Sequence, residues 1–213
     1  MSAQVIWEDL APPWRVVFEE AWTSFCAGNF GVGAALVDPS SGETVAVGRN
    51  RVAERDRLPG LISGNMTAHA EMNAFAALDR FDARGLHLYT TLEPCLMCIG
   101  SAMQLNVAHV HFAAADEFYD GMDELWAQHP LTAARRPAAT GPLPGVLASF
   151  ARLLPMAFTL RHFAGRSAEQ LARQRHPELA TLVDEHLGDG DPTSISADGS
   201  LDEALAFLAP DLP

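Results

Sequence analysis

The spacing of apolar residues in this chain switches between helical and strand-like periods. From 12 to 26, apolar side chains recur every three or four positions behind a proline pair, and Gly28 follows, which predicts an amphipathic helix. Two short β-rich runs, 32–37 and 44–47, flank a turn-forming segment and predict a hairpin. The first fifty residues are therefore expected to form a helix that packs on a two-stranded ribbon.

Two further runs, 86–91 and 107–112, have the composition of strands. An alanine-rich segment, 67–78, precedes the first of them and predicts a helix that Thr67 caps; a second helix is expected to begin at Pro94. Helices that connect strands imply parallel pairing. The prediction is an α/β fold, a three-layer α/β/α domain with a mixed central sheet.

The pattern changes after residue 130. Alanine, proline and arginine dominate 130–145 and predict a linker, after which the pattern predicts helices, the first interrupted by Pro155. Glycine, aspartate and serine then predict a flexible stretch before a short helix. The expected organisation is a main α/β domain over 1–130, a linker and helical extension over 131–187, and an acidic, flexible tail over 188–213. The expected helices are 146–163, 167–187 and 201–208.

The net charge of −13 argues against a polyanionic partner, because nucleic-acid binding depends on neutralising phosphates. The charge is uneven: residues 1–130 carry −10, residues 131–166 carry +5 and residues 167–213 carry −8. We interpret the basic middle segment as a solvated face. No apolar run is long enough to span a membrane and no secretory signal is visible, so we expect a cytoplasmic location.

Four residues suggest the chemistry. His69 and Glu71 are followed by Cys95 and Cys98, which together offer an imidazole, a carboxylate and two thiolates. Cys95 and Cys98 fall on one face of a helical first turn, and three protein ligands with an open fourth position are typical of catalytic zinc. Glu71 lies about 200° around a helix from His69, which frees it from metal binding to carry protons. The remaining cysteine, Cys26, is expected to be a small buried hydrophobe.

The order H-x-E then P-C-x-x-C resembles the zinc-dependent nucleobase deaminases of the cytidine-deaminase-like family. Thr67-Ala-His-Ala-Glu71, Thr91-Leu-Glu-Pro-Cys-Leu-Met-Cys98 and Gly31-Val-Gly-Ala-Ala-Leu-Val37 look like its branch of tRNA-adenosine and guanine deaminases. The resemblance implies the family fold, a fifth strand after a helix near 121–128, and a homo-oligomer, expected to be a dimer.

Residue by residue, the resemblance makes His69, Cys95 and Cys98 the Zn²⁺ ligands and Glu71 the proton shuttle. It makes Asn50 a substrate-binding amide, and the backbone at Ala70 is expected to bind the edge of the substrate ring. The family's Asp-Pro-Thr before the histidine is here Asn65-Met66-Thr67, and a glycine-rich stretch after Phe112 is missing. Because of these departures from the family pattern, the sequence does not identify which substrate is deaminated.

The sequence is compatible with three functions. The first is hydrolytic deamination of a small nucleobase, nucleoside or related heterocycle, with no nucleic-acid partner. The second is deamination of an adenosine in tRNA, which the motifs favour and the acidic charge opposes. The third is a non-catalytic, zinc-stabilised interaction module. His87, His109 and His111 are interpreted as isolated structural or surface residues, since three metal ligands are already present.

Overall fold

The computed structural model describes residues 10–187 and 199–213. Helices and strands alternate through the first half of the chain, and helices alone follow the last strand. In chain order they are α2 (Pro12–Cys26), β1 (Gly33–Val37), β2 (Thr44–Arg49), α3 (Ala70–Ala76), β3 (His87–Leu92), α4 (Leu96–Gln104), β4 (His109–Ala114), a 3₁₀ turn (Glu117–Tyr119), α5 (Met122–Ala127), α6 (Pro130–Arg135), β5 (Ala138–Thr140), α7 (Val146–His162), α8 (Ser167–Arg175), α9 (Pro177–His186) and α10 (Leu201–Leu208).

The five strands form one mixed sheet in the order β2-β1-β3-β4-β5. β1 runs antiparallel to both β2 and β3, whereas β3, β4 and β5 are parallel. β1 is buried along its whole length, which explains its unbroken apolar sequence. The parallel pairing expected for the second pair of strands is confirmed, and it brings the carboxyl ends of β3 and β4 to the same edge.

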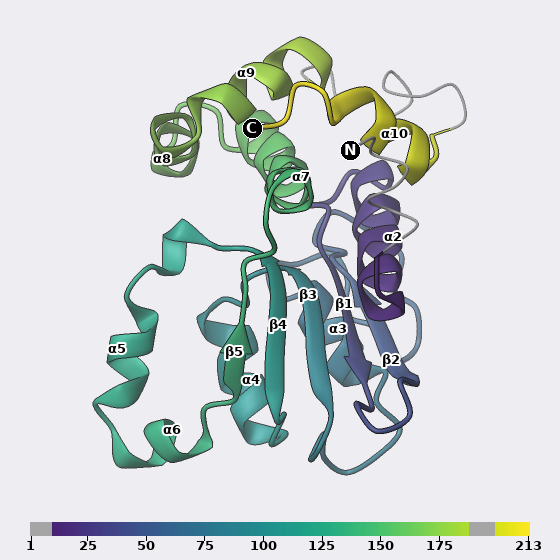
Figure 1. Ribbon diagram of the computed structural model, residues 1–213, viewed down its shortest axis with the longest axis vertical. Helices are drawn as coiled ribbons and strands as arrows, with labels where there is room; N and C mark the ends of the chain where they lie inside the picture. Colours follow the sequence, from purple (N-terminus) through teal and green to yellow (C-terminus); the bar gives the residue numbers. More distant parts are fainter. Residues whose placement is uncertain (1–9, 188–198) are drawn as a thin grey trace.

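Helices cover both faces of the sheet (Figure 1). Leu36, Leu88 and Val110 point to the face under α3 and α4, while Ala35 and Val37 point to the face under α2. α7 lies on the α2 side and packs against the end of β4. The three-layer α/β/α fold is therefore confirmed.

Two helices begin later than the sequence pattern predicted. His69, not Thr67, is the N-cap residue of α3, and Cys95, not Pro94, immediately precedes α4. Thr67 instead hydrogen-bonds through its backbone N–H to Asn65 Oδ1 at 2.9 Å, in a turn before the helix. The consequence is that each helix starts at a residue expected to bind metal.

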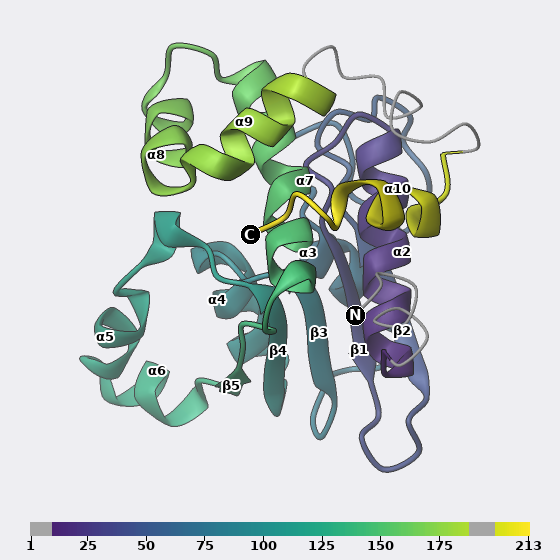
Figure 2. The same ribbon diagram turned by 45° about the horizontal axis from the view of Figure 1, so that its top comes forward.

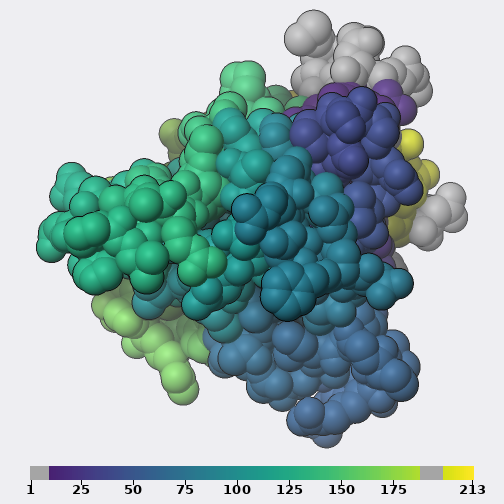
Figure 3. Space-filling view, turned by 90° about the horizontal axis from the view of Figure 1, so that it is seen from below, coloured from purple at the N-terminus to yellow at the C-terminus, as the bar shows by residue number. Residues whose placement is uncertain are grey.

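The segment expected to be a linker, 130–145, contains α6 and β5. The fifth strand that the resemblance implied is present as β5. It pairs with β4 at the edge of the sheet, although its three residues are two alanines and a threonine. A strand this short and exposed carries no apolar alternation, so its sequence gave no strand signal. α5 and α6 project from the sheet edge as a separate lobe (Figure 3).

α7 continues through Pro155, where an interruption was expected. Proline costs a helix interior about 3 kcal/mol, but burial of several large side chains on α7 offsets more than that. The expected helix 167–187 is two helices, because Pro177 disfavours helical geometry at His176. Figure 2 shows α8 and α9 beside α7, above the carboxyl edge of the sheet.

The short helix expected at 201–208 is present as α10 and buries Leu205 and Leu208 in the core formed with α2. Most of the stretch expected to be flexible, 188–198, lies outside the described residues. Cys26 is exposed at the end of α2, so its prediction as a buried hydrophobe is wrong. Within the described ranges, no helix combines the length and the apolar character needed to cross a membrane.

Candidate active site

The three predicted metal ligands meet where α3 and α4 begin. His69 is the N-cap residue of α3, Cys95 is the N-cap residue of α4, and Cys98 lies in the first turn of α4. α4 follows directly from the carboxyl end of β3, which fixes its first turn against the sheet. The partial positive charge of a helix N-terminus stabilises thiolate anions.

The ligand atoms are spaced to hold one tetrahedral cation. Cys95 Sγ lies 3.5 Å from both His69 Nδ1 and Cys98 Sγ, and Cys98 Sγ lies 3.6 Å from His69 Nδ1. Ligands at zinc bond lengths in tetrahedral geometry would be about 3.6–3.8 Å apart. Among the residues described, no fourth histidine, cysteine or carboxylate joins this group. The donor set fits Zn²⁺ with one position left for a small molecule.

Hydrogen bonding between the two thiols also indicates a cation site. Hydrogen bonding to Cys98, and then to His69, lowers the pKa of Cys95 to about 4, while the contact with Cys95 and burial raise the pKa of Cys98. The two sulfur atoms are thus in direct contact and their pKa values are shifted in opposite directions. A divalent cation would displace thiol protons and hold both groups as thiolates.

Glu71 lies in the first turn of α3, outside the ligand group. Its side chain is 3% exposed, and burial raises the pKa of its carboxyl to about 7. It interacts with the side chain of Cys98 and lines the same pocket as His69 and Cys95. The structure therefore places a buried carboxyl beside the metal ligands and outside their group, and its role as a proton shuttle stays a prediction.

A residue that sequence reasoning missed holds α3 in place. Asn73 is fully buried; its amide donates to Arg49 O at 3.1 Å and Ile62 O at 3.0 Å, and its Oδ1 accepts from Ile62 N at 2.8 Å. These bonds join the helix to β2 and to the preceding loop. They fix the direction in which Glu71, two positions earlier, leaves the helix.

The predicted substrate amide, Asn50, is buried and lines the pocket. Its Oδ1 accepts a hydrogen bond from the Val52 backbone N–H at 3.2 Å, so its NH₂ end is the one that can donate to a ligand. The side chain of Ala70 is fully buried in the core between α3 and the sheet, and Ala70 is not among the residues that line the pocket, although its neighbours His69 and Glu71 are.

The pocket has a volume of about 330 Å³, at the small end of ligand-binding sites. Its polar side chains are Asn50, Glu71, Glu93, Asp116, Tyr119 and Thr159, and its other lining residues are mainly apolar. Burial raises the pKa of Asp116 to about 6. Asp116 follows the carboxyl end of β4, the usual position of ligand-binding residues in parallel sheets, and that position is the signal that could have identified it.

Comparison with known proteins agrees with this geometry. The model of the cytidine and deoxycytidylate deaminase zinc-binding region matches residues 13–114. A tRNA-specific adenosine deaminase of Aquifex aeolicus is 34% identical over 112 residues, which cover 51% of this chain and 68% of that protein. The chain belongs to the cytidine-deaminase-like family. Its Zn²⁺ site consists of His69, Cys95 and Cys98.

Other known proteins match over different extents. A tRNA(Ile)-lysidine synthase of Deinococcus radiodurans is 34% identical over 105 residues. That match covers 46% of this chain and only 16% of the synthase. The structure of a guanine deaminase from Nitrosomonas europaea has a TM-score of 0.52 and 25% identity, covering 70% of this chain and 84% of that one. These relatives differ in substrate, so the family alone does not select one.

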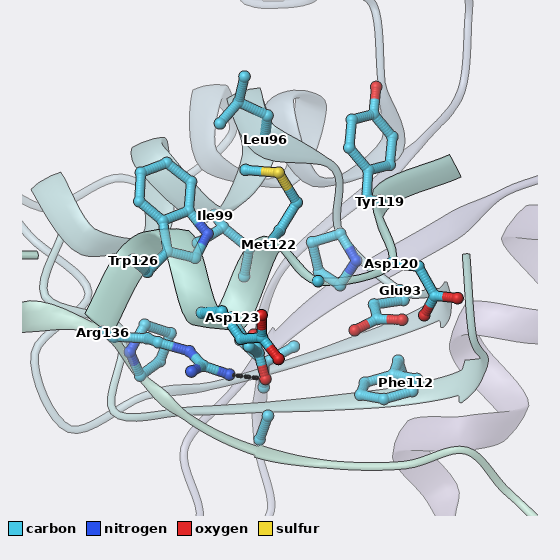
Figure 4. A pocket seen from close by; sticks show the side chains of 16 residues that line it. Glu93, Leu96, Ile99, Phe112, Tyr119, Asp120, Met122, Asp123, Trp126 and Arg136 are labelled. Carbon is cyan, nitrogen blue, oxygen red and sulfur yellow. Dashed lines mark ion pairs between the residues drawn. The ribbon is translucent and has the colours of Figure 1, made fainter. Parts of the chain in front are cut away.

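A second pocket adjoins the deaminase site on the side of α5 (Figure 4). It encloses about 270 Å³ between α4, β4 and α5, and Glu93 and Tyr119 line both pockets. Apolar side chains of Leu96, Ile99 and Trp126 form one wall, and an ion pair between Arg136 and Asp123 stands at the other. The pocket therefore separates the α5 segment from α4, the helix whose first turn contains Cys98.

Proposed function

We propose that this protein is a zinc-dependent hydrolytic deaminase that removes an amino group as ammonia from a small heterocycle, a nucleobase or nucleoside class compound. One observation carries the proposal: a three-ligand site with an open position lies beside a buried carboxylate that is not a ligand. When bound in such a site, Zn²⁺ supplies a Lewis acid that lowers the pKa of a water molecule to roughly 7.

Glu71 then moves the protons. Its carboxylate accepts a proton from the attacking water and delivers it to a ring nitrogen as the water oxygen bonds to the amino-bearing carbon. The carboxylate next takes the proton of the hydroxyl group now bonded to that carbon and transfers it to the amino group, so the C–N bond breaks, ammonia is released and a carbonyl remains on the ring. One carboxylate serves both halves because it is alternately base and acid.

The remaining polar groups orient the ring. We assign the Asn50 amide to the ring edge and the Ala70 backbone to the opposite polar edge, close to the first turn of α3. Asp116 and Tyr119 line the same end of the pocket, where Asp116 can accept a hydrogen bond from the amino group. Burial of these groups strengthens each hydrogen bond and gives the site its orientation.

The Glu71→Gln variant tests the proposal. It should bind zinc with unchanged stoichiometry and lose ammonia release by at least ~100-fold, because general acid–base catalysis contributes that much or more. Glu178→Gln, a change at an exposed residue of α9, is the matched control and should keep full activity. Comparable turnover by purified Glu71→Gln protein would refute the assignment.

A tRNA adenosine is the second candidate, and the identity with the Aquifex aeolicus tRNA-specific adenosine deaminase favours it. The −10 charge of residues 1–130 opposes it, since phosphate neutralisation drives RNA binding. Titrating tRNA at several salt concentrations separates the two. We expect weak binding, and tight, strongly salt-sensitive binding would reverse the order of the candidates.

An ammonia-release screen over bases, nucleosides and related heterocycles identifies the substrate. Release from any compound in the panel would also exclude the non-catalytic interaction module. Homo-oligomerisation and a cytoplasmic location stay predictions, and sedimentation analysis of the purified protein tests the first.

A further inference from the structure

We propose that the C-terminal extension supplies the wall that makes this active site select a bare heterocyclic base over the same base carrying ribose. The inference rests on the proposed deaminase function and concerns what that site admits. Thr159, Phe163 and Ala168 line the pocket, yet they lie on α7, at its end and on α8, beyond the family match that stops at residue 114.

The wall is a packed aromatic group. Phe30, from the segment before β1, contacts two phenylalanines of the extension: its ring centroid is 4.0 Å from that of Phe158 and 6.3 Å from that of Phe163. The Arg166 guanidinium lies 5.9 Å from the Phe163 ring. Phe163 is thus fixed from two sides and presents a phenyl ring to the pocket.

The one hydroxyl on this wall has no proton left to donate to a ligand. Thr159 Oγ1 donates to Pro155 O at 3.0 Å, inside α7. The remaining residues toward the extension and the rim are Met66, Phe118 and Ala168, none of which has a polar side chain. Ligand atoms that reach this side therefore meet apolar surface.

The side of the pocket next to the metal ligands is polar. Asp116 acts electrostatically on His69 and Cys95, and Tyr119 hydrogen-bonds with Cys95, so both lie close to the metal ligands. Glu71 is at the same end. A planar base could place its nitrogen-rich edge among these groups and its flat faces against phenyl rings.

This polarity separates a base from its nucleoside. In cytidine and in adenosine alike, the sugar is attached on the side of the ring away from the amino-bearing carbon. With that carbon at the metal end, ribose points toward the side lined by Phe163 and Ala168, where each hydroxyl that becomes buried loses water and gains no hydrogen-bond donor. Each such loss weakens binding about tenfold, so the nucleoside is disfavoured.

The extension is tied to the pocket independently of Phe163. Glu117 Oε1 lies 3.2 Å from Arg152 Nη2 of α7 and 2.6 Å from His176 Nε2, between α8 and α9. Arg152 also donates to Ala115 O at 3.0 Å. These contacts keep α7 and α8 beside the loop that carries Asp116. Truncating the half-buried Phe163 should therefore remove part of the pocket wall while the extension stays folded.

The test compares kcat/KM for one base and its own nucleoside, the base being the compound that releases ammonia most rapidly. Wild-type protein should prefer the base by at least about tenfold. Phe163→Ala should reduce that preference at least about fivefold, mainly by raising KM for the base. Phe207→Ala, on α10 of the same extension and away from the pocket, should leave the preference unchanged.

Two results would overturn the inference while leaving deamination intact: a wild-type preference for the nucleoside, or an unchanged preference in Phe163→Ala. If wild-type protein releases ammonia from no compound, the proposed function fails instead. Calorimetric titration of zinc-loaded Glu71→Gln protein with free bases and nucleosides then tests the wall directly. Base binding that weakens in the Glu71→Gln, Phe163→Ala double variant supports the wall, and unchanged or undetectable binding overturns it.

Discussion

The two ends of the active-site pocket are built in opposite ways. The metal end comes from two short helix starts within the family match, and its groups are polar, buried and placed within a few tenths of an ångström of metal-binding distances. The aromatic end comes largely from Phe163 and its neighbours on the extension, which fit by packing alone. Distance-critical chemistry needs fixed residue types, whereas a packed wall accepts many sequences of similar volume.

Removing a ligand at the metal end should give the largest effect. Cys98→Ser exchanges a soft thiolate for a hydroxyl, and a three-ligand site has no spare donor. We expect zinc content to fall from about one per chain to near zero and deamination to fall more than ~1000-fold. Elemental analysis of dialysed protein measures the first, and ammonia release the second.

Cys26→Ser provides the matched control, because Cys26 is exposed and lies outside the ligand group. It should keep both zinc and activity. If the Cys98→Ser protein retained one zinc per chain, the metal end would tolerate substitution of its residues as the aromatic end does. The contrast drawn between the two ends of the pocket would then be wrong.

The backbone beneath the metal end should be nearly as sensitive. A Cβ on Gly48 would lie 2.2 Å from Ala74 N and 2.3 Å from Ala70 O, so β2 and α3 touch through their main chains. Backbone atoms cannot rotate away, and we expect Gly48→Ala to lower the free energy of unfolding by about 3 kcal/mol. Urea denaturation measures this loss.

Gly100→Ala on α4 is the control for Gly48→Ala. An added Cβ there meets no atom within 4 Å, and alanine favours a helix, so stability should rise slightly or stay unchanged. Equal destabilisation by both changes would mean that close approach to α3 is not what makes Gly48 necessary.

The metal end could be predicted from the sequence because its chemistry limits the choice of residues. His69, Cys95 and Cys98 converge as expected, and Glu71 stands apart from them as expected. The first residues of α3 and α4 were predicted wrongly. An N-cap residue differs from the helical residue after it in backbone conformation, and the spacing of apolar residues does not reveal that difference.

The aromatic end could not be predicted in the same way. Phe163 and Thr159 are four positions apart on an apolar helix, a spacing that indicates core as readily as pocket. The contact of Phe163 with Phe30 joins segments more than a hundred residues apart, and no local sequence pattern predicts such a contact. β5 was not predicted from the sequence for a related reason: an exposed strand of three residues has no alternation of apolar and polar positions.

The tie between the two ends should show a moderate effect. Glu117→Gln keeps the shape of the side chain and removes the charge that pairs with Arg152 and His176. We expect the free energy of unfolding to fall by about 1.5 kcal/mol and KM to rise several-fold, because the loop carrying Asp116 loses its anchor. Steady-state kinetics and urea denaturation measure the two effects.

Asp184→Asn removes a comparable ion pair, with Arg173, from the outer side of the extension. Exposed pairs contribute little, so this variant should change stability by less than about 0.5 kcal/mol and leave KM unaltered. An equal rise in KM in both variants would point to general loosening of the extension and away from a tie at Glu117.

The smallest effect is expected on the sheet face away from the metal end. His87, His109 and His111, predicted to be isolated, lie together on β3 and β4, and His87 Nδ1 is 3.1 Å from His111 Nε2. Burial, and then the neighbouring histidines, lower the pKa of His111 to about 4. Unlike the metal end, this cluster sits on the α2 side of the sheet, beside Tyr89.

The pH dependence follows from the direction of that shift. Between about pH 6.5 and pH 4, unfolded His111 binds a proton that the folded protein resists, so stability is complete above pH 6.5 and declines as pH falls. His111→Asn should therefore lose about 1 kcal/mol less than wild type between pH 7 and pH 5, allowing for the partial exposure of the ring. Urea denaturation at both pH values gives the difference. Parallel losses in the two proteins would show that the cluster is solvated, and that acid sensitivity resides at the metal end.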